Sequence, residues 1–173
     1  MGAEEETGFE PATGDGPPPL GVSDGAMDAD RAAAVRAASV RTAVEGLLQI
    51  RRLTNTGQAD PEAVPAEWEL HRTVRAVALA LEASGATPSA VDASGRRTTA
   101  GYRVLEGESP GTARVEWAGP PGSGAVHEEE ESLPRCADAL RRLGWTALLY
   151  RGPRRRRFLE VEPPAGAMRA KGA

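Results

Sequence analysis

The chain has 173 residues, of which 40% are hydrophobic and only 4% aromatic, so it has room for one modest and mostly aliphatic core. No stretch reaches the roughly 18 to 20 consecutive apolar residues of a membrane span, and the first thirty residues are acidic where a secretory signal would be basic. The single cysteine, Cys136, excludes an intramolecular disulfide framework. We therefore expect a cytoplasmic protein with no membrane partner.

Charge is distributed unevenly along the chain. Residues 1–30 hold eight of the 25 acidic residues and none of the 21 Lys and Arg residues. The segment 1–27 is also rich in Gly and Pro and has no apolar periodicity, so it cannot bury enough surface to offset the entropy of ordering. We expect a disordered acidic N-terminal tail over 1–27.

Residues 28–85 carry two apolar stripes at helical spacing, which predict a helical hairpin. The first helix is expected from 28 to about 53, and its stripe consists of Val40, Val44 and Leu47 and runs on to Arg51. The second helix follows Pro65, and its apolar residues recur at spacings of four, three and four: Leu70, Val74, Val77 and Leu81. A polar linker is expected over 86–98.

Residues 99–163 show strand alternation on both sides of a helical stripe, which predicts a ββαββ module. The expected strands cover 101–105, 112–117, 145–151 and about 155–162, with turns at 108–111 and at Gly152-Pro153, and the helix covers about 131–143. We therefore predict an α+β protein in which the helical hairpin packs on or beside a four-stranded antiparallel sheet. Because one helix covers only one face, the hairpin or a second copy is expected on the other. Residues 164–173 are expected to form a flexible C-terminal tail.

One loop partly resembles a phosphate-binding motif. The sequence from Gly119 to Gly124, GPPGSG, matches the opening of a Walker A loop. That motif then requires Lys to reach the phosphates and Ser or Thr to hold magnesium, whereas Ala125 and Val126 stand there. We therefore interpret the segment as a connecting loop.

The remaining reactive side chains occur without partners in the sequence. His127 and Glu131 would share a helix face, but two ligands do not make a zinc site. Cys136 lies on an apolar helix stripe, as a buried structural cysteine would, and His71 flanks another stripe. We predict no catalytic, cofactor-binding or metal-binding residues, and hence a protein that is not an enzyme.

The most unusual feature is the sequence RGPRRRR, which begins at Arg151 and occupies a predicted hairpin tip. Five like charges so close repel one another unless anions are nearby, and phosphate fits the guanidinium fork. The sequence therefore indicates a polyanion-binding site formed by Arg151, Arg154, Arg155, Arg156 and Arg157. Tyr150 or Phe158 would lie close enough to stack on a base.

An alternative explanation of the Arg cluster is equally physical. Arg at a strand end keeps a sheet edge soluble, and the acidic run 128–131 would supply counter-charges within the molecule. Our first functional prediction is thus a non-enzymatic interaction protein whose partner is an unidentified protein or a second copy of the chain. The second is sequence-independent nucleic-acid binding through the tip 151–157, with the acidic tail folding loosely over the tip and competing with anionic partners.

Overall fold

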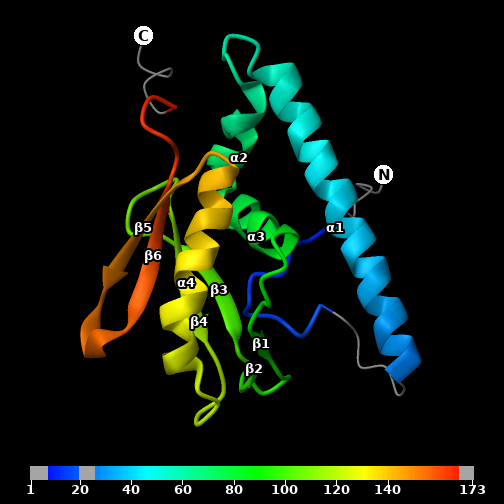
Figure 1. The fold of residues 1–173 in the computed structure, drawn as a ribbon, viewed down its shortest axis with the longest axis vertical. Helices are drawn as coiled ribbons and strands as arrows, with labels where there is room; N and C mark the ends of the chain where they lie inside the picture. Colours follow the sequence, from blue (N-terminus) through cyan, green and yellow to red (C-terminus); the bar gives the residue numbers. More distant parts are fainter. Residues whose placement is uncertain (1–7, 20–25, 168–173) are drawn as a thin grey trace, which may run out of the picture.

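The computed structural model describes residues 8–19 and 26–167, which form a mixed α+β fold (Figure 1). Its main sheet is antiparallel and has four strands in the order β3-β4-β6-β5: β3 (Gly101–Glu106), β4 (Ala113–Ala118), β5 (Thr146–Arg151) and β6 (Arg157–Glu162). The long helix α4 (Ala125–Arg142) connects β4 to β5. The predicted α+β class and four-stranded sheet are therefore confirmed.

Helix α4 begins six residues before the expected start at 131, and Pro134 lies inside it. A proline in a helix interior removes one backbone hydrogen bond and normally marks a helix end. Here the segment before Pro134 is held by its acidic side chains. Glu128 accepts a hydrogen bond from the Trp117 indole at 3.0 Å, and buried Glu129 accepts one from Arg156 at 2.8 Å.

The core lies between one face of the sheet and two helices. Strand alternation in β3, β4 and β6 directs one row of side chains toward the helices, and these side chains are at most 3% exposed: Val104, Val115, Leu159 and Val161. Helix α4 adds Leu133, Cys136 and Leu140 to the same cluster. Complete burial of each aliphatic side chain contributes roughly 1.5 to 3 kcal/mol. Three aromatic side chains, Tyr102, Trp117 and Trp145, complete this core.

The N-terminal helices do not cover the second face of the sheet. Helix α3 (Thr73–Ala83) packs beside α4, on the same face, and places Val77 and Leu81 in the common core. Helix α1 (Ala26–Thr54) packs mainly against α3 and extends away from the sheet (Figure 1). The expectation that the helical hairpin or a second copy covers the other face is thus not met by the helices of the described chain.

The second predicted helix is divided. Arg72, with φ −132° and ψ 53°, separates a short helix α2 (Glu67–His71) from α3. Immediately after the break, the Thr73 hydroxyl donates to the Gly111 carbonyl at 3.0 Å, which ties the start of α3 to the β3–β4 turn. The apolar spacing continues across the break, so the sequence pattern does not reveal it.

A buried ion pair joins the N-terminal helices to the sheet module. Arg51, at the end of the first predicted stripe, makes two hydrogen bonds to the Glu69 carboxylate, at 2.8 and 2.7 Å, and both side chains are at most 1% exposed. Its remaining guanidinium nitrogen donates to the carbonyls of Glu62 and Leu143 at 2.6 and 2.7 Å. Because every polar group of this pair has a partner, the pair orients four segments of the chain instead of leaving a buried charge unsatisfied.

The predicted linker 86–98 contains ordered structure. β1 (Ala90–Val91) and β2 (Arg97–Thr99) form a small antiparallel hairpin. Its turn is organised by Asp92, whose side chain accepts hydrogen bonds from the Ser94 hydroxyl and from the backbone N–H groups of Ser94 and Arg96. The hydrogen bond from the Ser94 side chain and those from the backbone lower the pKa of Asp92.

Residues 8–19 differ from the predicted disordered tail, because they run as an ordered segment beside β3. The Thr13 carbonyl accepts a hydrogen bond from the Val104 N–H at 2.7 Å, and the Tyr102 hydroxyl donates to the Ala12 carbonyl at 2.8 Å. Gly14 has φ +92°, and a Cβ at this position would collide with the backbone carbonyl of Tyr102. The segment therefore depends on a glycine and on a sheet edge far away in sequence, neither of which produces an apolar pattern. The rest of the predicted tail, apart from the start of α1, lies outside the described residues.

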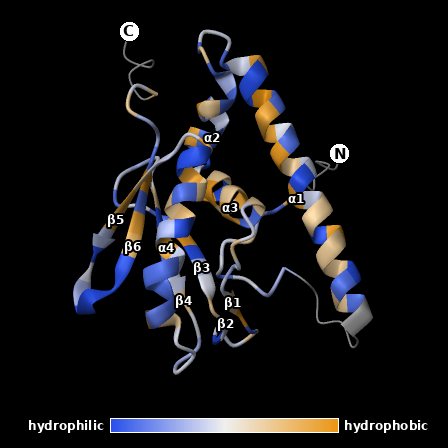
Figure 2. Cartoon of the chain, viewed as in Figure 1, coloured by the Kyte–Doolittle hydropathy of each residue, from blue (hydrophilic) through white to orange (hydrophobic). Residues whose placement is uncertain are grey.

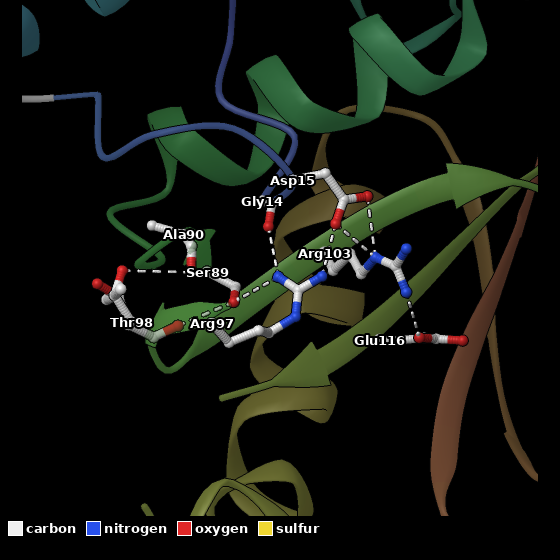
Figure 3. A network of polar contacts seen from close by, with 9 residues as sticks. Gly14, Asp15, Ser89, Ala90, Arg97, Thr98, Arg103 and Glu116 are labelled. Carbon is white, nitrogen blue, oxygen red and sulfur yellow. Dashed lines mark hydrogen bonds and ion pairs between the residues drawn. The ribbon is translucent and has the colours of Figure 1, made fainter. Parts of the chain in front are cut away.

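Acidic side chains of this segment pair with arginines of the body. Arg97 and Arg103 converge on Asp15 at 2.5 and 2.7 Å (Figure 3), and Arg75 pairs with Glu10 at 2.9 Å. Partial burial alone would raise the pKa of Asp15, but the hydrogen bonds from Arg103 and Arg97 outweigh it and lower that pKa. These contacts are made to α3, β2 and β3, and none reaches the β5–β6 turn, so the described part of the tail does not pair with the Arg-rich tip. Of the C-terminal tail, 164–167 form a turn, and 168–173 are outside the described part of the chain.

Candidate polyanion-binding site

The Arg-rich sequence forms the turn between β5 and β6. The Arg156 N–H donates to the Pro153 carbonyl at 3.3 Å, and the Gly152 N–H donates to the Arg156 carbonyl at 2.7 Å. The two central residues, Arg154 and Arg155, have φ of 59° and 60°. Positive φ at both central positions defines a type I′ turn, in which Asn-Gly is the preferred pair. The turn is therefore centred one to two residues beyond the predicted Gly152-Pro153, and it holds two arginines in a conformation that disfavours them.

Two of the five arginines are neutralised within the molecule. Arg156 pairs with the buried Glu129 at 2.8 Å and also donates to the Trp117 carbonyl. Arg157 pairs with Glu130 at 3.1 Å, and its backbone N–H donates to Glu129 at 3.0 Å. The acidic run at the start of α4 thus supplies counter-charges to this part of the cluster, as the alternative interpretation of the sequence proposed.

The other three arginines, Arg151, Arg154 and Arg155, are exposed. Among the described residues, none of the three has a side-chain hydrogen bond or an ion pair. In Figure 2 the tip of the β5–β6 hairpin is hydrophilic. We call these three residues the free Arg triad; its guanidinium groups are available to an external anion.

A basic cavity adjoins the tip. It has a volume of about 1260 Å³ and lies between the tip, the β2 end and the glycine-rich loop 119–124, at the same end of the molecule in Figure 1. Its charged lining consists of five arginines and one acid: Arg96, Arg97, Arg114, Arg156, Arg157 and Glu116. Helix α4 begins at this cavity, so the positive end of its dipole adds to the field of the arginines.

The face of the sheet opposite the helices carries an aromatic row beside the tip. The Arg114 guanidinium lies 3.9 Å from the centre of the Phe158 ring, and the Tyr150 ring is stacked on Phe158 with 5.8 Å between centroids. Tyr150 is 46% exposed, whereas Phe158 is half-buried. Of the two aromatic residues considered for base stacking, Tyr150 is therefore the accessible one.

The structure does not bring the potentially reactive side chains together. His127 lines the basic cavity, whereas Cys136 and His71 line two other cavities. Cys136 is 2% exposed, and burial raises the pKa of its thiol to about 11, which disfavours the nucleophilic thiolate. In the described part of the chain, no group of three or more His, Cys, Asp or Glu side chains is arranged to hold a metal ion. No helix of these residues is long and apolar enough to cross a membrane.

The chain has no significant match to a protein-family model, to a curated protein or to a solved structure. The site must therefore be interpreted from its own geometry. Of the five tip arginines that the sequence indicated, Arg156 and Arg157 line the cavity. The sequence did not indicate Arg96, Arg97 and Arg114, which the β1–β2 hairpin and β4 bring to the same cavity. One feature of the sequence did point to this cavity: the glycine-rich loop 119–124, which lines the cavity and directly precedes α4.

Proposed function

We propose that the protein is a non-enzymatic binding module whose tip holds the sugar–phosphate backbone of a nucleic acid without reading its sequence. The observation that carries this proposal is the free Arg triad. Three exposed guanidinium groups without counter-charges repel one another, and two of them sit at backbone positions that favour asparagine and glycine. Such an arrangement lowers stability, and a polymer of phosphates is the partner that offsets the repulsion best.

The surroundings of the triad support a backbone contact over base readout. Of the five arginines that line the basic cavity, four already pair with acids of this chain, namely Arg97, Arg114, Arg156 and Arg157. Arg96 has no ion pair among the described residues, so it extends the unpaired positive charge beyond the triad and offers a contact for a further phosphate. Tyr150 offers a sequence-tolerant ring face for a base of a single strand. A cytoplasmic location is part of the proposal, since nucleic acid and a reduced single cysteine are both expected there.

The experiment compares wild type with the double variant Arg154→Asn/Arg155→Gly, which gives the turn its preferred residues and removes two charges. Binding to a fluorescent oligonucleotide is measured by anisotropy at several salt concentrations. A wild-type contact of three phosphates predicts that log K falls with log salt with a slope of about −2 to −3. The variant should show a slope closer to zero by roughly 1.5 to 2.

The matched control is Arg31→Gln/Arg41→Gln, which removes the same charge from exposed positions on α1. It should retain the wild-type slope, because these arginines lie on the helix that extends away from the sheet. If the tip and control variants lost the same part of the salt slope, the effect would come from net charge and not from the tip. Binding that does not depend on salt would refute the proposal. Oligonucleotides of different sequence should bind equally.

A second candidate function, protein interaction, is favoured by a separate observation. Three consecutive apolar residues of β5, Leu148 to Tyr150, are 41% to 46% exposed on the outer strand of the sheet. This surface is independent of the free Arg triad and does not require an anionic partner.

A further inference from the structure

The two edges of the main sheet differ. At the β3 edge, other segments of the chain hydrogen-bond to the outward-facing backbone groups. The Val104 N–H donates to the Thr13 carbonyl and the Tyr102 N–H donates to the Thr87 carbonyl at 2.9 Å. The Tyr102 carbonyl accepts from the Ser89 N–H at 2.9 Å. The β5 edge has no such cover. Among residues 8–19 and 26–167, β6 is the only strand paired with β5, and the one side-chain hydrogen bond to the β5 backbone runs from the Arg141 guanidinium to the Ala147 carbonyl at 2.7 Å.

The exposed apolar side chains of β5 lie on both faces of the sheet, along its outer edge. Leu148 and Tyr150 point to the face opposite the helices, and Leu149 points to the helix face, because successive strand residues alternate. All three are nevertheless 41% to 46% exposed, so the exposure follows the strand edge. The run from Leu148 to Tyr150 contains neither charge nor proline, and an apolar edge of this kind readily pairs with another strand.

We propose that β5 pairs with β5 of a second copy in antiparallel orientation, across a two-fold axis at Leu149, to form a continuous eight-stranded sheet. This register keeps the helix faces of the two sheets on one side, since a shift of one residue would exchange the faces. Leu149 then lies opposite its counterpart, Leu148 lies opposite Tyr150, and Ala147 lies opposite Arg151. The apolar run thus covers itself.

The arginines of the tips favour the antiparallel orientation of the two copies, and the occupied β3 edge limits the assembly to two copies. The antiparallel register directs the two Arg-rich tips to opposite ends of the joint sheet, whereas a parallel register would place them side by side and cause repulsion. Because the β3 edge is already occupied, pairing through β5 closes at two copies and does not propagate into a fibre. The dimer does not depend on nucleic-acid binding.

The test is the oligomeric state of the full chain, measured by sedimentation velocity over a range of concentrations. Wild type should show a concentration-dependent dimer. Leu149→Lys places two unpaired ammonium groups at the centre of the interface, so it should weaken association by at least about tenfold. The matched control is Leu53→Lys, the same substitution at an α1 leucine that is 67% exposed, and it should remain dimeric.

The register has a direct test. Leu149→Cys should form a disulfide between two copies under mild oxidation, since its Cα atoms would face each other at about the 4.4 to 6.8 Å that a disulfide spans. Leu53→Cys should not, and the buried Cys136 is common to both variants. A monomeric wild type, a Leu149→Lys variant that associates like wild type, or equal crosslinking of the two cysteine variants would overturn the proposal. Circular dichroism checks that each variant is folded.

Discussion

Arg154 and Arg155 occupy the central positions of a type I′ turn with positive φ, a conformation that costs a non-glycine residue about 1 kcal/mol or more. We therefore expect Arg154→Asn/Arg155→Gly to stabilise the protein by about 1 to 2 kcal/mol while it weakens nucleic-acid binding. Urea unfolding measures the first effect, and the anisotropy titration measures the second. A variant that loses both stability and binding would show that the arginines support the turn itself.

Cys136 provides a residue-scale test of the core. Burial raises the pKa of its thiol from 9.0 to about 11, so the folded state retains the proton over a range in which the unfolded state releases it. The stabilisation is complete below pH 9 and is lost as the pH rises through about 11, and it amounts to about 2 to 3 kcal/mol. Urea midpoints measured below pH 9 and near pH 11 should differ less in Cys136→Ala than in wild type. The same pH dependence in both proteins would contradict a buried thiol.

At the scale of elements, the segment 8–19 depends on one glycine. Gly14→Val should displace the segment, because the position has a positive φ and a Cβ would meet the Tyr102 backbone. We expect a loss of about 2 kcal/mol or more and faster hydrogen exchange at the Val104 N–H, which Thr13 protects. Gly16→Val is the matched control, since a Cβ at Gly16 meets no atom within 4 Å. Similar exchange in the two variants would show that the segment does not protect β3.

The buried Arg51–Glu69 pair gives a second prediction at this scale. Glu69→Gln keeps the size of the side chain but leaves the fully buried guanidinium without its counter-charge, so it should destabilise the fold by about 3 to 5 kcal/mol. Arg52→Gln removes a neighbouring pair whose side chains are 52% and 39% exposed, and it should cost less than about 1 kcal/mol. Thermal unfolding of both variants distinguishes the buried pair from the exposed one.

The elements that could be predicted from the sequence are those with a regular apolar period. β3, β4 and β6 alternate with a period of two, β5 is an apolar run bounded by turn residues, and the first stripe continues to the buried Arg51. The break at Arg72 and the β1–β2 hairpin were missed, because Thr73 and Asp92 build them from polar contacts that have no period. The candidate site was predicted in part: the tip arginines are adjacent in sequence, whereas Arg114 is brought near them by the main sheet and Arg96 by the turn of the β1–β2 hairpin.

For the whole molecule, the two proposals together imply a bivalent binder. In the β5-paired dimer, each Arg154 lies five residues beyond the central Leu149, and the last three of these are in the turn, so the two tips stand no more than roughly 35 Å apart at about 3.4 Å per extended residue. That separation is about ten base pairs of duplex at 3.4 Å per base pair. A duplex longer than this can contact both tips, and the second contact then occurs at high effective concentration.

Duplex length therefore separates dimeric from monomeric binding. Leu149→Lys should weaken binding to a duplex of about 30 base pairs by at least tenfold, while binding to a hairpin duplex of about 6 base pairs stays equal or becomes slightly tighter through the added charge. Leu53→Lys adds the same charge on α1 and keeps the dimer, so it should retain the length dependence. Anisotropy titrations with both duplexes measure the effect. If Leu149→Lys changed binding to the two lengths by the same factor, each tip would act alone, and the dimer would not contribute to nucleic-acid affinity.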